Sequence, residues 1–307
     1  MIKIDRITKK FGRLTAVQDL CLEVARGEIF GVLGHNGSGK STTIGMILGQ
    51  VWPTKGSVAL CGHDVHRHRA RALAKVGAIF EAPAFYDYLS GWRNLKILSS
   101  YSGRTPDARI LEVLDWVGLS GREHATVRTY SHGMRARLAI AQALLPSPDL
   151  LILDEPSDGL DPEGIHEMRE TIRRLHRELG LTIFLSSHLL HEVEQLCTRI
   201  AVLNRGHKVF EGALAQTRGS AGDNWIHLRT GDFELACRAL SEAGMLLNHR
   251  EGHLLQPAEG VSADQIVRHL VGHSLPVHEI MPHRPSLEEF YLTLMNPTSD
   301  PSTPNPQ

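Results

Sequence analysis

One glycine-rich stretch, residues 34–42, has the residue types and the spacing that hold phosphate groups. It reads Gly-His-Asn-Gly-Ser-Gly-Lys-Ser-Thr and fits the pattern G-x-x-x-x-G-K-[ST]. The glycines let the backbone turn tightly and aim several N–H groups at phosphate oxygens. The Lys40 ammonium can reach the terminal phosphates and assist their chemistry, and the Ser41 hydroxyl can ligate Mg²⁺. The residues predicted to bind a nucleotide here are Gly34, His35, Asn36, Gly37, Ser38, Gly39, Lys40, Ser41 and Thr42.

The flanks of this stretch distinguish a phosphate site from an ordinary glycine turn. Residues 28–33 have the pattern of a short buried strand, and residues 41–48 have that of a helix start. A helix N-terminus adds partial positive charge beside the loop. Nucleotide binding is therefore favoured over a turn that binds nothing, and kinases, GTPases, helicases and transport ATPases all stay open.

Two adjacent carboxylates point to hydrolysis. Asp154 and Glu155 follow the apolar run 150–153, which predicts a buried strand with both acids at its carboxyl end, where open α/β sheets bind ligands. There Asp154 can hold Mg²⁺, and Glu155 can accept a proton from water that attacks a γ-phosphate. His188 follows the next buried strand, 182–187. An imidazole beside Glu155 can hydrogen-bond the γ-phosphate and orient that water.

The elements that must position these groups are those of a large α/β domain. Residues 2–7 and 17–24 alternate apolar and polar side chains, as half-exposed antiparallel strands do. Residues 89–145 have helical periodicity and look like a helical insertion between strands of the nucleotide core. Ser131 is a good N-cap for a helix that runs to Leu145, and the free N–H groups at such a helix start also suit a phosphate.

The motifs lie in a first domain of residues 1–215, and a smaller α+β domain is predicted for residues 216–295. Its short strands and two helices fit a βαββαβ, ferredoxin-like order. Ser286 and Glu289 form a capping box for a last helix. The composition of residues 296–307 predicts a disordered tail.

Composition excludes several classes of function. The chain has 307 residues, of which 42% are hydrophobic and 22% charged, and this suits one large α/β domain plus a small one. A formal net charge of −1 gives no reason to expect a nucleic-acid partner. No apolar run approaches the roughly 20 residues that cross a bilayer. The 4 cysteines form no CxxC pair and the 18 histidines match no closed zinc pattern, so we expect reduced cysteines in the cytoplasm and no zinc.

These motifs, in this order, resemble the ATP-binding subunit of an ABC transporter, and the resemblance covers the whole first domain. It implies a P-loop nucleotide-binding domain with an antiparallel β-subdomain and a helical subdomain, ATP and Mg²⁺ as cofactors, and ATP hydrolysis. Phe11, on a predicted loop between the first two strands, resembles the aromatic residue that stacks on adenine. Asp161 resembles the D-loop aspartate, and His188 resembles the switch histidine. Ser131 and Gly133 resemble the signature positions that contact the γ-phosphate held by another subunit.

Two positions depart from the family pattern. The signature usually reads LSGGQ, but His132 and Met134 replace its first glycine and its glutamine. Because Ser131 and Gly133 are kept, we expect function to be retained. Glu81 stands where the family's Q-loop carries a glutamine, and the sequence around it resembles the bacitracin- and lantibiotic-resistance branch of exporter ATPases, which is known for this glutamate. A carboxylate there is a candidate Mg²⁺ ligand, and a role only in capping the strand and contacting the membrane partner stays equally open.

The resemblance also implies partners and a location. A head-to-tail pair of nucleotide-binding domains, either a homodimer or two different ABC subunits, holds two ATP molecules at its interface. A separate multi-span permease exports the substrate, a peptide antibiotic, a drug or a lipid-like molecule. The protein is then expected in the cytoplasm, peripheral on the inner face of the cell membrane. Two other functions stay open: a soluble ABC ATPase that acts on ribosomes or DNA, and an ATP-dependent switch without turnover.

Overall fold

The chain divides into two compact units in the computed structural model. The main unit comprises residues 1–214 together with the residues from 293 onward, and the accessory unit comprises residues 215–292. The structure describes residues 1–80, 84–101, 105–218, 225–250, 252–283 and 286–295. The predicted tail, residues 296–307, lies outside the described residues.

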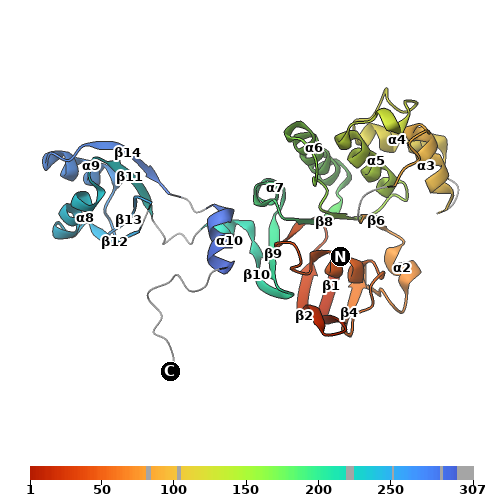
Figure 1. Ribbon diagram of the computed structural model, residues 1–307, viewed down its shortest axis with the longest axis horizontal. Helices are drawn as coiled ribbons and strands as arrows, with labels where there is room; N and C mark the ends of the chain where they lie inside the picture. The colour runs from red at the N-terminus through yellow and green to blue at the C-terminus, as the bar shows by residue number, and fades with distance from the viewer. Residues whose placement is uncertain (81–83, 102–104, 219–224, 251, 284–285, 296–307) are drawn as a thin grey trace. The chain divides into compact units, whose positions relative to one another are not determined.

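A six-stranded, mostly parallel sheet forms the centre of the main unit (Figure 1). Its strands, in spatial order, are β10 (His207–Ala213), β9 (Arg199–Asn204), β3 (Ile29–Leu33), β8 (Thr182–Ser187), β7 (Leu150–Asp154) and β6 (Val76–Ile79). Every residue of β3 and β8 is buried, as expected for parallel strands that are covered on both faces. The parallel register pairs Leu33 with Ser187 and Asp154 with Ser186, so the carboxyl ends of β3, β7 and β8 meet at one edge.

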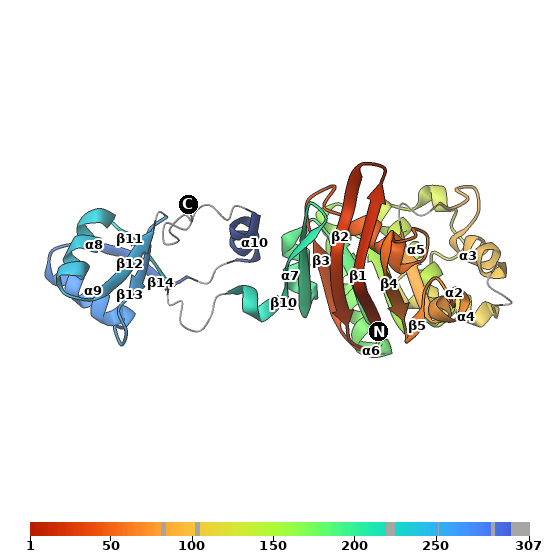
Figure 2. The same cartoon turned by 90° about the horizontal axis from the view of Figure 1, so that it is seen from below.

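A four-stranded antiparallel sheet forms a second layer of the main unit (Figure 2). Its strands, in spatial order, are β2 (Leu14–Val24), β1 (Ile2–Phe11), β4 (Lys55–Leu60) and β5 (His63–Asp64). Strands β1 and β2 extend beyond the predicted 2–7 and 17–24. Bulges shift the register of the pair and break the alternation of apolar and polar residues on which that prediction relied. Phe11 pairs with Leu14 and is therefore the last residue of a strand, and its predicted place on a loop was wrong.

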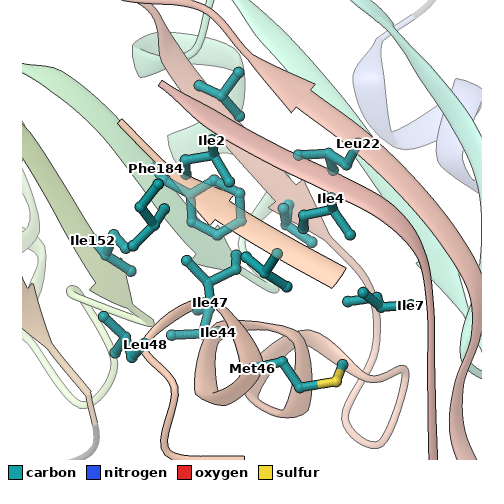
Figure 3. Packing of buried hydrophobic residues seen from close by; sticks show 14 of the residues in the cluster. Ile2, Ile4, Ile7, Leu22, Ile44, Met46, Ile47, Leu48, Ile152 and Phe184 are labelled. Atoms are coloured by element: carbon teal, nitrogen blue, oxygen red, sulfur yellow. The ribbon is translucent and has the colours of Figure 1, made fainter. Parts of the chain in front are cut away.

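Helix α1 (Lys40–Ile47) supplies the middle of the hydrophobic core between these two sheets (Figure 3). Ile47 packs in one buried cluster with Ile4 of β1 and Phe184 of β8. Each such fully buried side chain contributes about 1.5–3 kcal/mol relative to exposure. Because the helix is buried along most of its length, its first residue, Lys40, is held firmly in place.

The other helices of the main unit include the predicted helical insertion. They are α2 (Arg69–Leu73), α3 (Gly91–Ser100), α4 (Asp107–Trp116), the 3₁₀ turn η1 (Val127–Thr129), α5 (His132–Leu144), α6 (Pro162–Leu179) and α7 (Leu190–Leu196). Figure 1 shows α3, α4 and α5 gathered together as the insertion. The sequence did not predict α2, because five residues are too few to show helical periodicity. Among the described residues, none of the helices is long and apolar enough to cross a membrane.

The accessory unit has a four-stranded antiparallel sheet with helices α8 and α9 packed on it (Figure 1). Its elements follow η2 (Leu214–Arg218) and are β11 (Ile226–Thr230), α8 (Phe233–Glu242), β12 (Leu246–Arg250), β13 (Leu254–Pro257), α9 (Ala263–Gly272) and β14 (Val277–Pro282). This is the βαββαβ order that the sequence predicts, with a core of its own around Leu228 and Leu240. The last helix, α10 (Leu287–Met295), begins at the predicted cap, where the Glu289 N–H donates to the Ser286 hydroxyl.

Candidate functional site

A cavity of about 740 Å³ opens where the carboxyl ends of the parallel strands meet. Its lining includes the predicted site residues Phe11, Asn36, Gly37, Gly39, Lys40, Ser41, Thr42, Glu155 and His188. Leu14, Thr15, Ala16, Asp158 and Arg205 complete the lining. These residues lie on or directly after different strands and come from distant parts of the sequence. The fold therefore gathers most of the predicted set in one cavity, called here the nucleotide cavity.

Lys40 is the most buried charged group of this cavity, with a side chain only 5% exposed. Its Nζ donates to the Gly34 carbonyl at 2.7 Å and to the His35 carbonyl at 3.4 Å, and lies 3.1 Å from Glu155 Oε1. An ammonium group so deep in the protein needs such partners, because burial of an unpaired charge is costly. An arriving phosphate must therefore replace at least one of these oxygens.

Tight contacts with neighbouring residues fix the glycine-rich stretch 34–42, called here the phosphate loop. A Cβ added to Gly34 would lie 2.3 Å from Ser38 Oγ, so only glycine fits there. Gly39 has φ +105, and a Cβ there would lie 2.8 Å from the Ala16 carbonyl. Ser38 is fully buried, and neither it nor Gly34 or His35 lines the cavity. These residues shape the loop, and the others of the stretch face the cavity.

Glu155 lies directly after β7, between a lysine and a histidine. Its φ of +49 is a left-handed conformation that few non-glycine residues adopt, and its N–H donates to Ser186 Oγ at 3.0 Å. Oε2 pairs with His188 Nδ1 and accepts from the His188 backbone N–H at 3.3 Å. Oε1 faces Lys40. Each carboxylate oxygen thus has its own partner.

Two opposing influences set the pKa of Glu155. Burial is the largest single one and raises the pKa, because the charged form loses water. Hydrogen bonds from His188 and Lys40, followed by their charges, lower the pKa and together prevail, so it lies below its ordinary value. The carboxylate is therefore ionised at neutral pH and able to accept a proton.

Asp154 and Ser41 offer hard oxygen donors for a cation. Asp154 accepts a hydrogen bond from the Ser186 hydroxyl and lines a neighbouring cavity of about 460 Å³, while Ser41 lines the nucleotide cavity. Glu155 borders both cavities. Within the described ranges, no three His, Cys, Asp or Glu side chains gather to hold a metal. This donor set fits Mg²⁺, which proteins bind through one or two side chains together with substrate phosphates.

Phe11 offers a flat apolar surface at the rim of the nucleotide cavity. Its side chain is 49% exposed, and that of Leu14, across the turn, is 66% exposed. Lys9 Nζ lies 4.8 Å from the Phe11 ring centroid. An aromatic face that is half open to solvent is suited to stack on a nucleotide base.

Three further predicted residues lie at the starts of α5 and α6, also outside the nucleotide cavity. Ser131 is the N-cap of α5, and its Oγ accepts from the Met134 N–H at 3.2 Å. Asp161 is the N-cap of α6 and accepts from the Gly164 N–H at 2.9 Å. A Cβ on Gly133 would lie 3.5 Å from Gly164 Cα, so the two helix starts are in contact.

Glu81 lies outside the described residues, so its predicted role stays a prediction. The segment that follows it is tied to α5 and to η1. Asp87 Oδ1 accepts from the Arg135 guanidinium at 2.6 Å, and the Asp87 carbonyl accepts from the Arg128 N–H at 2.9 Å. A displacement of this segment would therefore act directly on the start of α5.

Sequence reasoning missed five cavity residues, of which Asp158 and Arg205 are charged. Asp158 borders both cavities, three residues after Glu155, and its place after the acidic pair was the available signal. Arg205 lies between β9 and β10. The Arg205-Gly206 pair between two predicted strands signals a tight turn, but it does not tell which loop the turn faces.

Comparisons with known proteins agree with this geometry. Residues 17–158 match the family model described as ABC transporter. The chain is 36% identical to the uncharacterized ABC transporter ATP-binding protein YhcH of Bacillus subtilis (strain 168), over 98% of this chain and 97% of that protein. It is 34% identical to the bacitracin transport ATP-binding protein BcrA of Enterococcus faecalis, over 96% of both chains. A dimeric structure of the ATP-binding cassette MJ0796 in a post-hydrolysis state, bound to ADP and Pi, matches with a TM-score of 0.62 at 25% identity, over 72% of this chain and 100% of that chain.

Proposed function

This chain belongs to the family of ABC transporter ATP-binding proteins, and we propose that it powers export through a separate multi-span membrane permease. As a member of that family it is an ATPase. The observation that carries the ATPase part of the proposal is the cluster of Lys40, Glu155 and His188 in the nucleotide cavity. Export through a permease is inferred from the relatives, among them the bacitracin transport protein BcrA.

The cluster supports a role for Glu155 as the group that accepts a proton from water. Its carboxylate is ionised and held by His188 on one oxygen and by Lys40 on the other. When ATP enters, its phosphate oxygens replace the carboxylate at Lys40, and the released oxygen faces the attacking water. His188 remains beside the carboxylate and orients that water. Ser41 and Asp154 would hold Mg²⁺, which when bound neutralises charge on the phosphates.

We place the second half of each ATP site on another subunit. Ser131, Gly133 and Asp161 lie outside the nucleotide cavity of their own chain. The free N–H groups at the start of α5 suit a γ-phosphate, and a head-to-tail pair brings this start to the cavity of the other chain. The second chain is either another copy or a different ABC subunit. The dimeric form of the similar cassette MJ0796 supports this arrangement.

The substrate class is proposed from the relatives. BcrA is a bacitracin transport protein, which favours a peptide antibiotic among the wider set of drugs and lipid-like molecules. The permease makes the substrate contacts, and the chain works in the cytoplasm on the inner face of the membrane. Neither a nucleic acid nor zinc has a part in this proposal.

The permease is tested by capture of the ATP-bound state. Tagged Glu155→Gln protein is purified with ATP from gently solubilised cells, and its companions are identified by mass spectrometry. We expect a multi-span membrane protein without an ATPase domain of its own, because the variant binds ATP but turns it over poorly. Lys40→Ala is the matched control, since it loses the phosphate partner and should recover less of that protein. Ribosomal proteins or DNA in place of a membrane protein would contradict export and leave the ATPase assignment intact.

A further inference from the structure

The turn between β9 and β10 has a backbone that does not suit its first residue. Arg205 has φ +47 and Gly206 has φ +82, so both residues of this two-residue turn are left-handed. Hairpin turns of this kind favour Asn, Asp or Gly at the first position, because a larger side chain is strained there. A strained residue persists where something else favours it, and this often occurs at a binding site.

The turn is attached to the nucleotide site on two sides. The Gly206 N–H donates to the Ser38 carbonyl of the phosphate loop at 3.0 Å, and the Gly206 carbonyl accepts from the Gln18 N–H of β2 at 2.8 Å. His35 Nε2 lies 3.2 Å from Asn204 Oδ1. These contacts fix the turn as part of the cavity wall and hold the backbone of Arg205 in its left-handed conformation.

Arg205 itself lines the nucleotide cavity and is exposed to it. In the part of the chain that the structure describes, its guanidinium group makes no hydrogen bond or ion pair. The other cation of the lining, Lys40, is already engaged by Gly34 and Glu155. Arg205 therefore brings an unengaged positive charge to a cavity that receives a polyanion.

The place of the turn indicates which part of the nucleotide this charge meets. The Ala16 carbonyl would lie 2.8 Å from a Cβ on Gly39 and 2.8 Å from a Cβ on Gly206, so the turn adjoins the junction of β2 and the phosphate loop. Phe11, Ala16 and Lys40 all line the cavity. In the proposed function Phe11 stacks on the base and Lys40 binds the terminal phosphates. The turn contacts Ala16, which also contacts Gly39 beside Lys40 and lies on β2, the strand that follows Phe11. We therefore assign the turn to the part of the nucleotide between its base and its terminal phosphates.

We propose that Arg205 is a nucleotide-contacting residue that binds the segment of ATP where the α-phosphate joins the ribose. The inference rests on the proposed function, because it requires ATP in this cavity. This contact accounts for the left-handed backbone of Arg205 and for its unengaged guanidinium group. Contact with the phosphate favours an arginine where the backbone alone favours asparagine or glycine.

The test compares affinity with stability in Arg205→Asn. Asparagine followed by Gly206 suits the turn, so we expect the melting temperature of the nucleotide-free protein to rise by about 2–4 °C. Without the guanidinium, we expect affinity for ADP and for a non-hydrolysable ATP analogue to fall by about fivefold, to the same extent for both. Affinity for adenosine should not change. The measurements are thermal unfolding and isothermal titration calorimetry of the full chain.

Two further variants separate charge from backbone effects. Arg205→Lys keeps the positive charge and should retain most of the affinity. Arg6 also has a left-handed backbone, with φ +45, but does not line the cavity, so Arg6→Asn should raise the melting temperature and leave nucleotide affinity unchanged. Wild-type affinity in Arg205→Asn would overturn this inference alone. A wild-type protein that binds neither ADP nor the ATP analogue would overturn the proposed function and this inference with it.

Discussion

The main unit and the accessory unit use similar parts with different strand directions. In the main unit β3, β7 and β8 run parallel, so the loops after them meet and bring Lys40, Glu155 and His188 together. Among the described residues of the accessory unit every paired strand is antiparallel, so neighbouring strands of the sheet end at opposite edges. Convergence of polar groups in this chain therefore follows from strand direction, since both units contain acids, arginines and histidines.

The main unit also differs from the accessory unit in that it buries charged side chains. Lys40 and Glu192 of the main unit are each about 5% exposed, whereas no charged side chain is buried among the described residues of the accessory unit. Burial of charge costs stability unless partners compensate it, and such groups cluster at functional sites. If this difference is functional, changes to the two units should separate turnover from stability.

The largest expected effect is the loss of turnover in Lys40→Ala. Without the ammonium group the terminal phosphates lose their cationic partner, and ATP turnover should fall by about 10²–10³-fold. The measurement is phosphate release at saturating MgATP. Arg268→Ala is the control, because it removes an exposed cation from α9 of the accessory unit and should leave turnover unchanged. Equal losses in both variants would remove the functional distinction between the units.

A core substitution in the accessory unit should give an intermediate effect, and on stability alone. Leu240 is fully buried in the accessory core, so Leu240→Ala should lower the free energy of unfolding of that unit by about 2–5 kcal/mol. Turnover should stay at the wild-type level, because the described residues that line the nucleotide cavity all belong to the main unit. Calorimetric unfolding and an ATPase assay measure the two quantities. A loss of turnover while the accessory unit remains folded would show that it takes part in the reaction.

The smallest expected effects concern the pH dependence of stability, to which Glu155 and Glu192 should contribute in opposite directions. The pKa of Glu155 is lowered on folding, so its contribution to stability is present above its unfolded pKa and is lost as pH falls through the folded value. Burial raises the pKa of Glu192, against the Ser157 and Ser187 hydroxyls that lower it. Its ionised form therefore destabilises the fold, and this penalty is relieved as pH falls through the raised pKa.

Melting temperatures of Glu155→Gln and Glu192→Gln, measured against wild type from pH 7 to pH 4, test this pair. We expect differences of about 2–4 °C, for a change near 1 kcal/mol. The wild-type advantage over Glu155→Gln should shrink as pH falls. Wild type should gain relative to Glu192→Gln over the same range. Parallel trends in the two variants would contradict the opposite pKa directions.

Local patterns explain why much of the main unit was predictable. The apolar run before Asp154 and the loop of residues 34–42 each specify a structure within a few residues, and both lie where the sequence predicts. Ser131 caps α5 as predicted. The βαββαβ order of the accessory unit followed from its alternating short strands and helices.

Long-range contacts explain what sequence reasoning missed. The bulges in β1 depend on its pairing with β2. The sequence alone therefore did not show that Phe11 belongs to the strand. Arg205 lines the nucleotide cavity beside Gly206, which hydrogen-bonds to Ser38 and to Gln18, and nothing local to the turn reveals those contacts. The Lys40–Glu155 ion pair joins two motifs whose separate roles were predicted, but their mutual contact was not.

The role of Glu155 is tested most directly by Glu155→Gln, with nucleotide binding and ATP turnover measured on one preparation. We predict that turnover falls by about 10²–10⁴-fold, because the amide cannot accept the proton of the attacking water. Nucleotide affinity should equal or exceed that of wild type, since Lys40 no longer has a carboxylate that competes with phosphate. Wild-type turnover in this variant, with nucleotide binding intact, would contradict the assignment of Glu155 as the proton acceptor.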